Sequence, residues 1–161
     1  MSNIDIDQAL PELAALRGNE LGVSEWRLVD QAQIDRFSEL TGDAGPIHNE
    51  PDVARQIAPF GGTIVQGFML LAFLTGFAKN LELPQQGVAF RLNYGFDRVR
   101  IIAPVPVNSE VRGHFVLRDI VARGDDAALM TIEAIVEIEG SDRPALVADW
   151  LAYLQLEREP S

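Results

Sequence analysis

The sequence contains no cysteine, and it has only two histidines among its 161 residues. Without cysteine the chain forms no disulfide bond and no zinc site built on thiolates, and two imidazoles are few ligands for any other metal centre. The sequence also lacks the Gly-x-Ser-x-Gly turn of serine hydrolases, the glycine-rich turn of dinucleotide-binding proteins and the Walker phosphate loop. We therefore expect no metal site and none of these three chemistries.

Basic residues are a minority, since 13 Lys and Arg stand against 24 Asp and Glu, which gives a formal charge of −11. This excess of negative charge argues against broad binding to nucleic acid or to an anionic membrane. The longest apolar stretch, residues 64–78, is interrupted by polar residues and glycines and is shorter than the roughly 20 apolar residues of a membrane-spanning helix. The acidic start of the chain does not resemble a signal peptide. We expect a cytoplasmic protein with no nucleic-acid or membrane partner.

The residues that are present indicate one folded domain over residues 1–161, with 47% hydrophobic residues to supply a core. Apolar residues at helical spacing in the first half give way to strict alternation in the second half. Asp30 and Gln33 form a capping pattern at the start of one helix, and Gly42 ends it. The predicted helices cover residues 6–17, 31–40, 51–57 and 63–80, and the predicted strands cover residues 22–29, 88–102, 110–122, 128–140 and 145–157.

The helix over residues 63–80 is apolar nearly all round, and such a helix is normally buried. Four consecutive strands follow it, so an antiparallel sheet is available to cover it. A curved sheet wrapped around a long central helix satisfies both elements, and this arrangement is the hotdog fold of the α+β class. The open edge of such a sheet is usually covered by another chain, so we expect a homodimer.

The loop over residues 42–49 contains Gly42, Gly45 and Pro46, so we expect it to be irregular. It carries Asp43 and His48 five residues apart. These residues could simply stabilise a turn and the start of the next helix. They could also form an acid and a base that share one water, since an imidazole accepts a proton near neutral pH and a desolvated carboxyl has a raised pKa.

Gly67 and Thr75 are the second group of candidates. A backbone N–H in the first turn of a helix has no partner within the helix, so that of Gly67 could bind a carbonyl oxygen on which charge develops. Gly67 could instead allow close packing on a strand. Thr75 lies about two turns later, and its hydroxyl could contact substrate or bond back to its own helix. His114 lies within a strand without an acidic partner motif, and we interpret it as structural.

Two segments, FSELTGDAGPIH (37–48) and IVQGFMLLAFLTGF (64–77), resemble the MaoC-like hydratases, which include the (R)-specific 2-enoyl-CoA hydratases of the hotdog fold. A third segment, NYGFDRVRIIAPVPVNSEVR (93–112), resembles the single-domain branch of that family related to nodulation protein N. The resemblance covers roughly residues 25–155, and the spacing of the first motif is specific.

The resemblance implies reversible hydration of trans-2-enoyl-CoA to (R)-3-hydroxyacyl-CoA without any cofactor, so the partner is an acyl-CoA thioester. It implies that Asp43 and His48 form the catalytic dyad, that Gly67 supplies the oxyanion-hole N–H, and that Thr75 helps to hold the dyad and the water. Two positions depart from the family pattern. Gly45 stands where asparagine is usual, and Gln66 stands where histidine is usual.

Three alternatives remain open: a hotdog acyl-CoA thioesterase, an acyl-CoA-binding dimer without turnover, and a purely structural subunit. Arg98 and Arg100 are candidates for binding the phosphates of coenzyme A. The side chains that could limit the length of the acyl chain are Phe60, Phe68 and Phe73.

Overall fold

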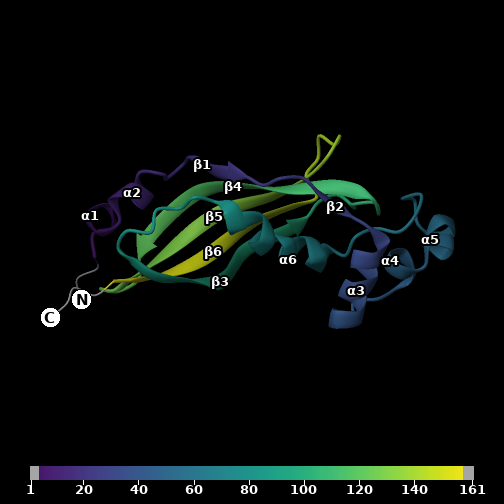
Figure 1. Cartoon of the computed structure of the whole chain (residues 1–161), viewed down its shortest axis with the longest axis horizontal. Coiled ribbons are helices and arrows are strands. Elements are labelled where there is room, and N and C mark those ends of the chain that lie inside the picture. Colours follow the sequence, from purple (N-terminus) through teal and green to yellow (C-terminus); the bar gives the residue numbers. More distant parts are fainter. Residues whose placement is uncertain (1–3, 158–161) are drawn as a thin grey trace.

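The computed structural model describes residues 4–157, which form a single antiparallel sheet with helices along one face and at both ends (Figure 1). Within this part of the chain the strands are β1 (Glu20–Val23), β2 (Arg27–Val29), β3 (Val88–Ile101), β4 (Ser109–Ala122), β5 (Ala127–Ile138) and β6 (Leu146–Leu156). The helices are α1 (Ile6–Ala9), α2 (Pro11–Ala14), α3 (Gln31–Thr41), α4 (Pro46–Asn49), α5 (Pro51–Ile57) and α6 (Gly67–Phe77). The strand order is β1-β4-β5-β6-β3, and β2 also pairs with β4.

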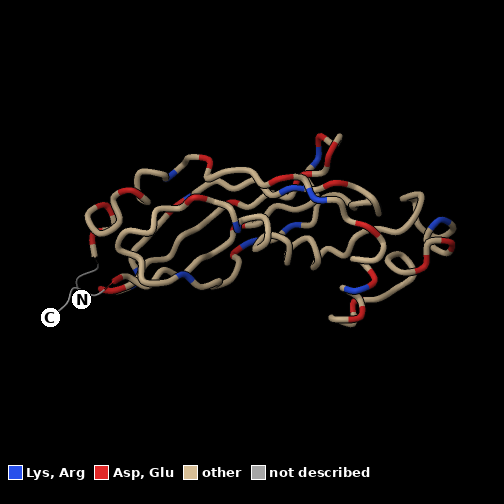
Figure 2. The backbone as a smooth tube through the Cα atoms, viewed as in Figure 1, with Lys and Arg blue, Asp and Glu red and all other residues tan. Residues whose placement is uncertain are grey.

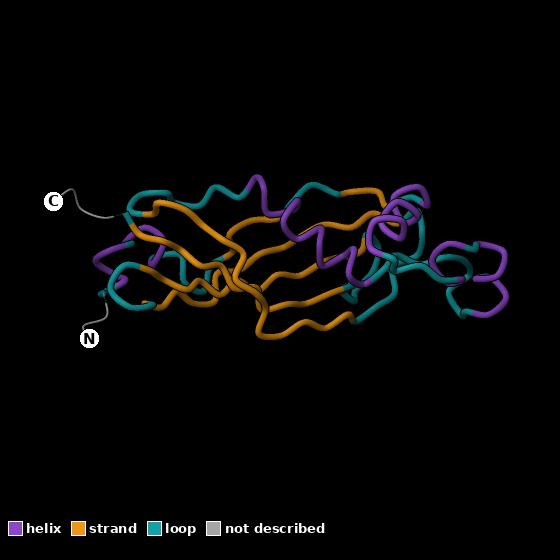
Figure 3. Tube along the Cα trace, turned by 90° about the horizontal axis from the view of Figure 1, so that it is seen from below, coloured by secondary structure: helices purple, strands orange, loops and turns teal. Residues whose placement is uncertain are grey.

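The four long strands form at the predicted places because their apolar residues alternate with polar ones. In β5 the even-numbered side chains are buried, and the odd-numbered ones from Leu129 onward are half-buried on the other face. Helix α6 lies against the buried face of the sheet (Figure 3). At Gly113 in β4 the helix comes so close that an added Cβ would lie 2.7 Å from the Cβ of Phe77. The α+β hotdog architecture predicted from the sequence is confirmed.

Helix α6 differs from the prediction in its start and in its burial. It begins at Gly67 because residues 63–66 are extended, with the N–H of Val65 donating to the carbonyl of Val105 at 2.8 Å. It ends at Phe77, and a short 3-10 turn (Ala78–Asn80) follows. The prediction of burial on all sides was wrong, because Met69, Leu70, Leu74 and Phe77 are buried whereas the side chain of Phe68 is 67% exposed.

Three other elements also differ from their predictions. The first helix is divided at Leu10, because Pro11 has no N–H to continue the ladder and instead begins α2. The strand predicted over 22–29 forms the two short strands β1 and β2 on β4. The loop 42–49 was expected to be irregular, but residues 46–49 form one helical turn, α4, because proline favours the first helical position.

Helices α3, α4 and α5 form a small lobe at one end of the sheet, beyond the start of α6 (Figure 1). Lys and Arg are scattered along the described chain among more numerous Asp and Glu (Figure 2). No helix within residues 4–157 is both long enough and apolar enough to cross a membrane.

Candidate functional site

The candidate site is built on residues 42–49, here called the Asp–His loop, which leaves the end of α3. The start of α3 is fixed by a capping box: Asp30 Oδ1 accepts from the N–H of Gln33 at 2.9 Å, and Gln33 Oε1 accepts from the N–H of Asp30 at 3.0 Å. Its end is Gly42, whose φ of 77° is a left-handed conformation that glycine adopts easily. The chain therefore turns sharply just before Asp43.

The imidazole of His48 is held in one orientation. Its Nδ1 lies 2.7 Å from the carbonyl oxygen of Ile64. A carbonyl oxygen only accepts, so Nδ1 carries the hydrogen and Nε2 of the neutral ring keeps the lone pair. The backbone carbonyl of His48 accepts from Gln31 Nε2 at 2.7 Å, which fixes the residue from the other side. His48 is therefore presented as a proton acceptor through Nε2.

His48 and Gly67 line the same cavity, which has a volume of about 290 Å³. The remaining lining is almost wholly apolar and comprises Ile64, Val65, Leu70, Ile101, Ile102, Ala103, Pro104 and Val105. Gly67 is the first residue of α6, so its N–H has no acceptor within the helix ladder. An added Cβ at Gly67 would lie only 2.3 Å from Ile101 Cδ1, so the absence of a side chain lets the cavity wall approach closely.

Asp43 begins the same loop but is not among the residues that line this cavity. The residue is half-buried. Its N–H donates to Thr41 Oγ1 at 3.2 Å, and its carbonyl oxygen accepts from Ser38 Oγ at 2.9 Å. The backbone of Asp43 is thus anchored on α3, which leaves its carboxylate as the part of the residue available for chemistry.

Thr75 lies apart from the other candidates. It is exposed and lines a second cavity of about 370 Å³ between α6 and β3, together with Phe68, Phe96 and Trp150 among others. The separation follows from helix geometry: eight residues at 3.6 per turn leave Thr75 rotated by about 80° from Gly67. The structure therefore does not bring Thr75 to the cavity of His48 and Gly67.

The arginines considered for coenzyme A are engaged elsewhere. Arg98 Nε lies 3.2 Å from Asp149 Oδ2, and Arg100 donates to the neighbouring carbonyl of Val99 at 2.8 Å. Neither arginine lines the cavity of His48 and Gly67. Within residues 4–157, no group of three or more His, Asp or Glu side chains is arranged to hold a metal ion.

The aromatic side chains considered as limits on the acyl chain are not gathered around that cavity. Phe60 lies in the turn after α5 and is 37% exposed. Phe73 of α6 packs against Phe77, with the guanidinium of Arg27 over its ring at 4.2 Å. Of the three, Phe68 alone lines either of the two cavities beside α6.

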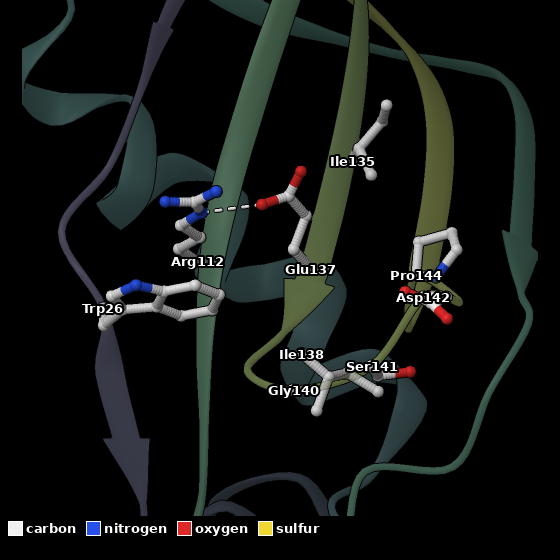
Figure 4. Close-up of a pocket in the computed structure, with 9 residues that line it drawn as sticks. All are labelled: Trp26, Arg112, Ile135, Glu137, Ile138, Gly140, Ser141, Asp142 and Pro144. Carbon is white, nitrogen blue, oxygen red and sulfur yellow. Dashed lines mark hydrogen bonds and ion pairs between the residues drawn. The ribbon is translucent and has the colours of Figure 1, made fainter.

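A wider hollow of about 570 Å³ lies on the sheet face away from α6 (Figure 4). Arg112 is among the residues that line it. The Nε of Arg112 lies 2.6 Å from Glu137 Oε2, and its guanidinium lies 4.4 Å from the ring centre of Trp26. His114 also belongs to this face, where its Nε2 lies 2.8 Å from Glu20 Oε2. Because these charges already pair with one another, we interpret the hollow and His114 as structural.

Sequence reasoning missed a layer of polar residues beneath the Asp–His loop. Its members are Gln31, Asp35, Ser38 and Thr63, and they bond to one another, to the loop backbone and to the side chain of Asn49 at the end of the loop. The only signal in the sequence was the presence of amide and hydroxyl side chains on both sides of a predicted catalytic loop.

The sequence matches the family described as "MaoC like domain" over residues 12–138. It is 42% identical over 151 residues to nodulation protein N of Rhizobium leguminosarum bv. viciae, with 92% of each chain covered. It is 38% identical over 142 residues to 3-hydroxyacyl-thioester dehydratase Z of Mycobacterium tuberculosis, covering 88% of this chain and 93% of that one.

Among solved structures, the MaoC-like dehydratase from Rhodospirillum rubrum superposes with a TM-score of 0.76 at 19% identity, covering 93% of this chain and 98% of that one. At this identity the superposition supports the fold, and the sequence relatives establish the family. The chain belongs to the MaoC-like dehydratase family.

Proposed function

We propose that this protein catalyses the reversible hydration of trans-2-enoyl-CoA to (R)-3-hydroxyacyl-CoA. The observation that carries the proposal is the convergence of the His48 imidazole and the first N–H of α6 on one apolar cavity. A base for water and a donor for the thioester oxygen are the two groups that this reaction needs close together. The similarity to a 3-hydroxyacyl-thioester dehydratase supports the same chemistry, since dehydration is the reverse reaction.

In this mechanism Nε2 of His48 removes a proton from a water, and the resulting hydroxide attacks C3 of the enoyl group. The bond from Nδ1 to the Ile64 carbonyl holds the ring in the required tautomer and stabilises the imidazolium that forms. A partly positive N–H at a helix start suits the enolate oxygen, so the N–H of Gly67 takes that oxygen.

Asp43 completes the reaction in one of two ways: it orients the same water while the imidazolium of His48 returns its proton to C2, or it gives a proton to C2 itself. If Asp43 gives that proton, it is reloaded by the proton that His48 took from water, so the cycle is balanced. Thr75, in the neighbouring aromatic cavity, is assigned to contact with the acyl chain and not with the thioester oxygen.

We propose further that the protein is a homodimer formed through β3. Within residues 4–157 this strand pairs only with β6, so its outer edge is open. The exposed large apolar side chains on it are Phe90 (49%), Leu92 (55%), Tyr94 (53%), Phe96 (37%) and Ile101 (53%). An open edge with large apolar side chains is normally covered by another chain, and a second copy supplies an edge of the same kind.

The test is the loss of enoyl-thioester absorbance when the purified protein is added to crotonyl-CoA or to longer enoyl-CoAs, with free thiol measured in parallel. Loss of absorbance without thiol release, together with an (R)-3-hydroxyacyl product, is the expected result. Release of thiol would identify a thioesterase instead. Binding of the acyl-CoA without either change would identify a binding protein.

A further inference from the structure

Gln66 stands immediately before Gly67, and its side chain is fully buried, with 0% exposure. It occupies the N-cap position of α6, yet its carboxamide makes no capping bond to its own helix. Instead Nε2 lies 2.8 Å from Ser38 Oγ, 3.1 Å from the carbonyl of Ile34 and 3.3 Å from the carbonyl of Asp43. One side chain thus joins the start of α6 to α3 and to the Asp–His loop.

Ser38 extends this connection. Its hydroxyl lies 2.9 Å from the carbonyl of Asp43 and 3.1 Å from Asn49 Oδ1, and that amide oxygen also accepts from the N–H of Gly45 at 3.1 Å. Ser38 is itself only 7% exposed. The carbonyl of Asp43 therefore has two donors, the Ser38 hydroxyl and Gln66 Nε2. The N–H of Gly45 joins the same group of bonds through Asn49 Oδ1.

We propose that Gln66 is a positioning residue that fixes Asp43 relative to the N–H of Gly67. This inference rests on the proposed function, in which these two groups act on the same substrate. Gln66 is covalently joined to one of them and hydrogen-bonded to the backbone of the other, so it is the shortest connection between the two segments. It does not line the cavity of His48 and Gly67, so it acts through Asp43 and not on the substrate.

The pattern of bonds argues against a role in stability alone. Gln66 Oε1 is buried and has no hydrogen-bond partner among the protein groups of residues 4–157. Burying an unpaired carbonyl oxygen is costly, and an apolar side chain of the same length would avoid that cost. The Nε2 donors are therefore the part of Gln66 that the fold uses, and all three of their acceptors lie on α3 or the Asp–His loop.

His48 is held by bonds in which Gln66 takes no part. Gln31 Nε2 donates to the carbonyl of His48 at 2.7 Å, and Gln31 Oε1 accepts from the hydroxyl of the buried Thr63 at 2.6 Å. Loss of the Gln66 amide therefore frees the Asp43 end of the loop and leaves the His48 end held.

The experiment compares Gln66→Met and Ser38→Ala with wild type. Methionine keeps the length of the side chain and removes the carboxamide, both its Nε2 donors and the unpaired Oε1. Ser24→Ala is the matched control, because Ser24 Oγ accepts from the N–H of Gly113 at 2.9 Å on β4 and makes no bond to the Asp–His loop. For each variant we would measure kcat and KM with an enoyl-CoA, the Tm, and hydrogen exchange at the N–H of Gly45.

We expect Gln66→Met and Ser38→Ala to lower kcat by about 10- to 100-fold, because displacements near 1 Å cost about that much. KM should stay near the wild-type value, since ground-state binding does not depend on Asp43. Exchange at Gly45 should accelerate in both variants and stay at the wild-type rate in Ser24→Ala, which should also keep its kcat.

Wild-type kcat in Gln66→Met, or an equal loss of kcat in Ser24→Ala at the same fall in Tm, would overturn the inference. If Gln66→Met fails to fold, Ser38→Ala decides by the same criteria. If the wild-type protein hydrates no enoyl-CoA, the proposed function fails, and exchange at Gly45 still decides whether Gln66 holds the loop.

Discussion

The contact between Gly67 and Ile101 allows a direct test of the oxyanion-hole proposal through Gly67→Ala. The backbone at Gly67 is not in the left-handed region, so alanine fits it without strain. The new methyl would lie 2.3 Å from Ile101 Cδ1, whereas ordinary contact begins at 3.4 Å, so about 1.1 Å of movement is needed. Either the Ile101 side chain turns away or the start of α6 shifts from the cavity.

Ile101 is 53% exposed, so its side chain has room to turn, at a cost of about 0.5–1.5 kcal/mol for leaving its rotamer. A shift of the helix start moves the N–H away from the thioester oxygen, and a misplacement near 1 Å costs about 100-fold in rate. We therefore expect Gly67→Ala to lower kcat by about 10- to 100-fold, which corresponds to about 1.4–2.7 kcal/mol of transition-state stabilisation.

The companion variant is Ile101→Val, which removes Cδ1, while the next Ile101 atom lies 3.2 Å from the added Cβ. In a double-mutant cycle assayed by loss of enoyl-thioester absorbance, Gly67→Ala should cost much less in the Ile101→Val background than in wild type. Full activity of Gly67→Ala alone would contradict the expected shift of the α6 start, because the alanine N–H would then remain where the Gly67 N–H lies and Ile101 would have turned away. Equal losses in both backgrounds would refute the steric reasoning.

Two further predictions follow from the exposed edge and from the core. Leu92→Lys on the open edge of β3 should convert the dimer to a monomer in sedimentation experiments. The control is Leu28→Lys on β2, which should leave the protein dimeric, since Leu28 is 51% exposed and Leu92 is 55% exposed. A dimeric Leu92→Lys protein would contradict the β3 interface. Gly113→Ala should lower the free energy of unfolding by about 1–3 kcal/mol in denaturant titrations. The reason is that the new Cβ would lie 2.7 Å from Phe77 Cβ and 2.8 Å from the Phe115 ring. Unchanged stability would show that α6 does not pack tightly against β4.

Local signals were enough to predict much of the fold. The alternation in β5, the capping box of Asp30 and Gln33, and the glycine stop at Gly42 each act within a few residues, and the structure has all three.

The start of α6 could not be predicted in this way. Residues 63–66 are apolar enough to be helical, but their backbone pairs with residues 105–107, which lie far along the chain. The exposure of Phe68 has a similar origin, since a strongly apolar helix does not reveal which side its own sheet leaves uncovered.

The residues of the candidate site were also predicted only in part. Asp43, His48 and Gly67 were singled out by their type and spacing, and the structure places His48 and Gly67 on one cavity. Gln66 was noted only as a departure from the family pattern, because its three bonds reach residues on α3 and on the Asp–His loop that no local rule connects to it.

The most direct test of the central claim is the rate of hydration of crotonyl-CoA by wild type, His48→Ala and Asp43→Asn at equal concentration and confirmed fold. The account predicts turnover by wild type and losses of about 10²–10⁴-fold in each variant, as expected for groups that move protons in the transition state. Rates within a few-fold of wild type in either variant would contradict the assignment of Asp43 and His48 as the reacting pair.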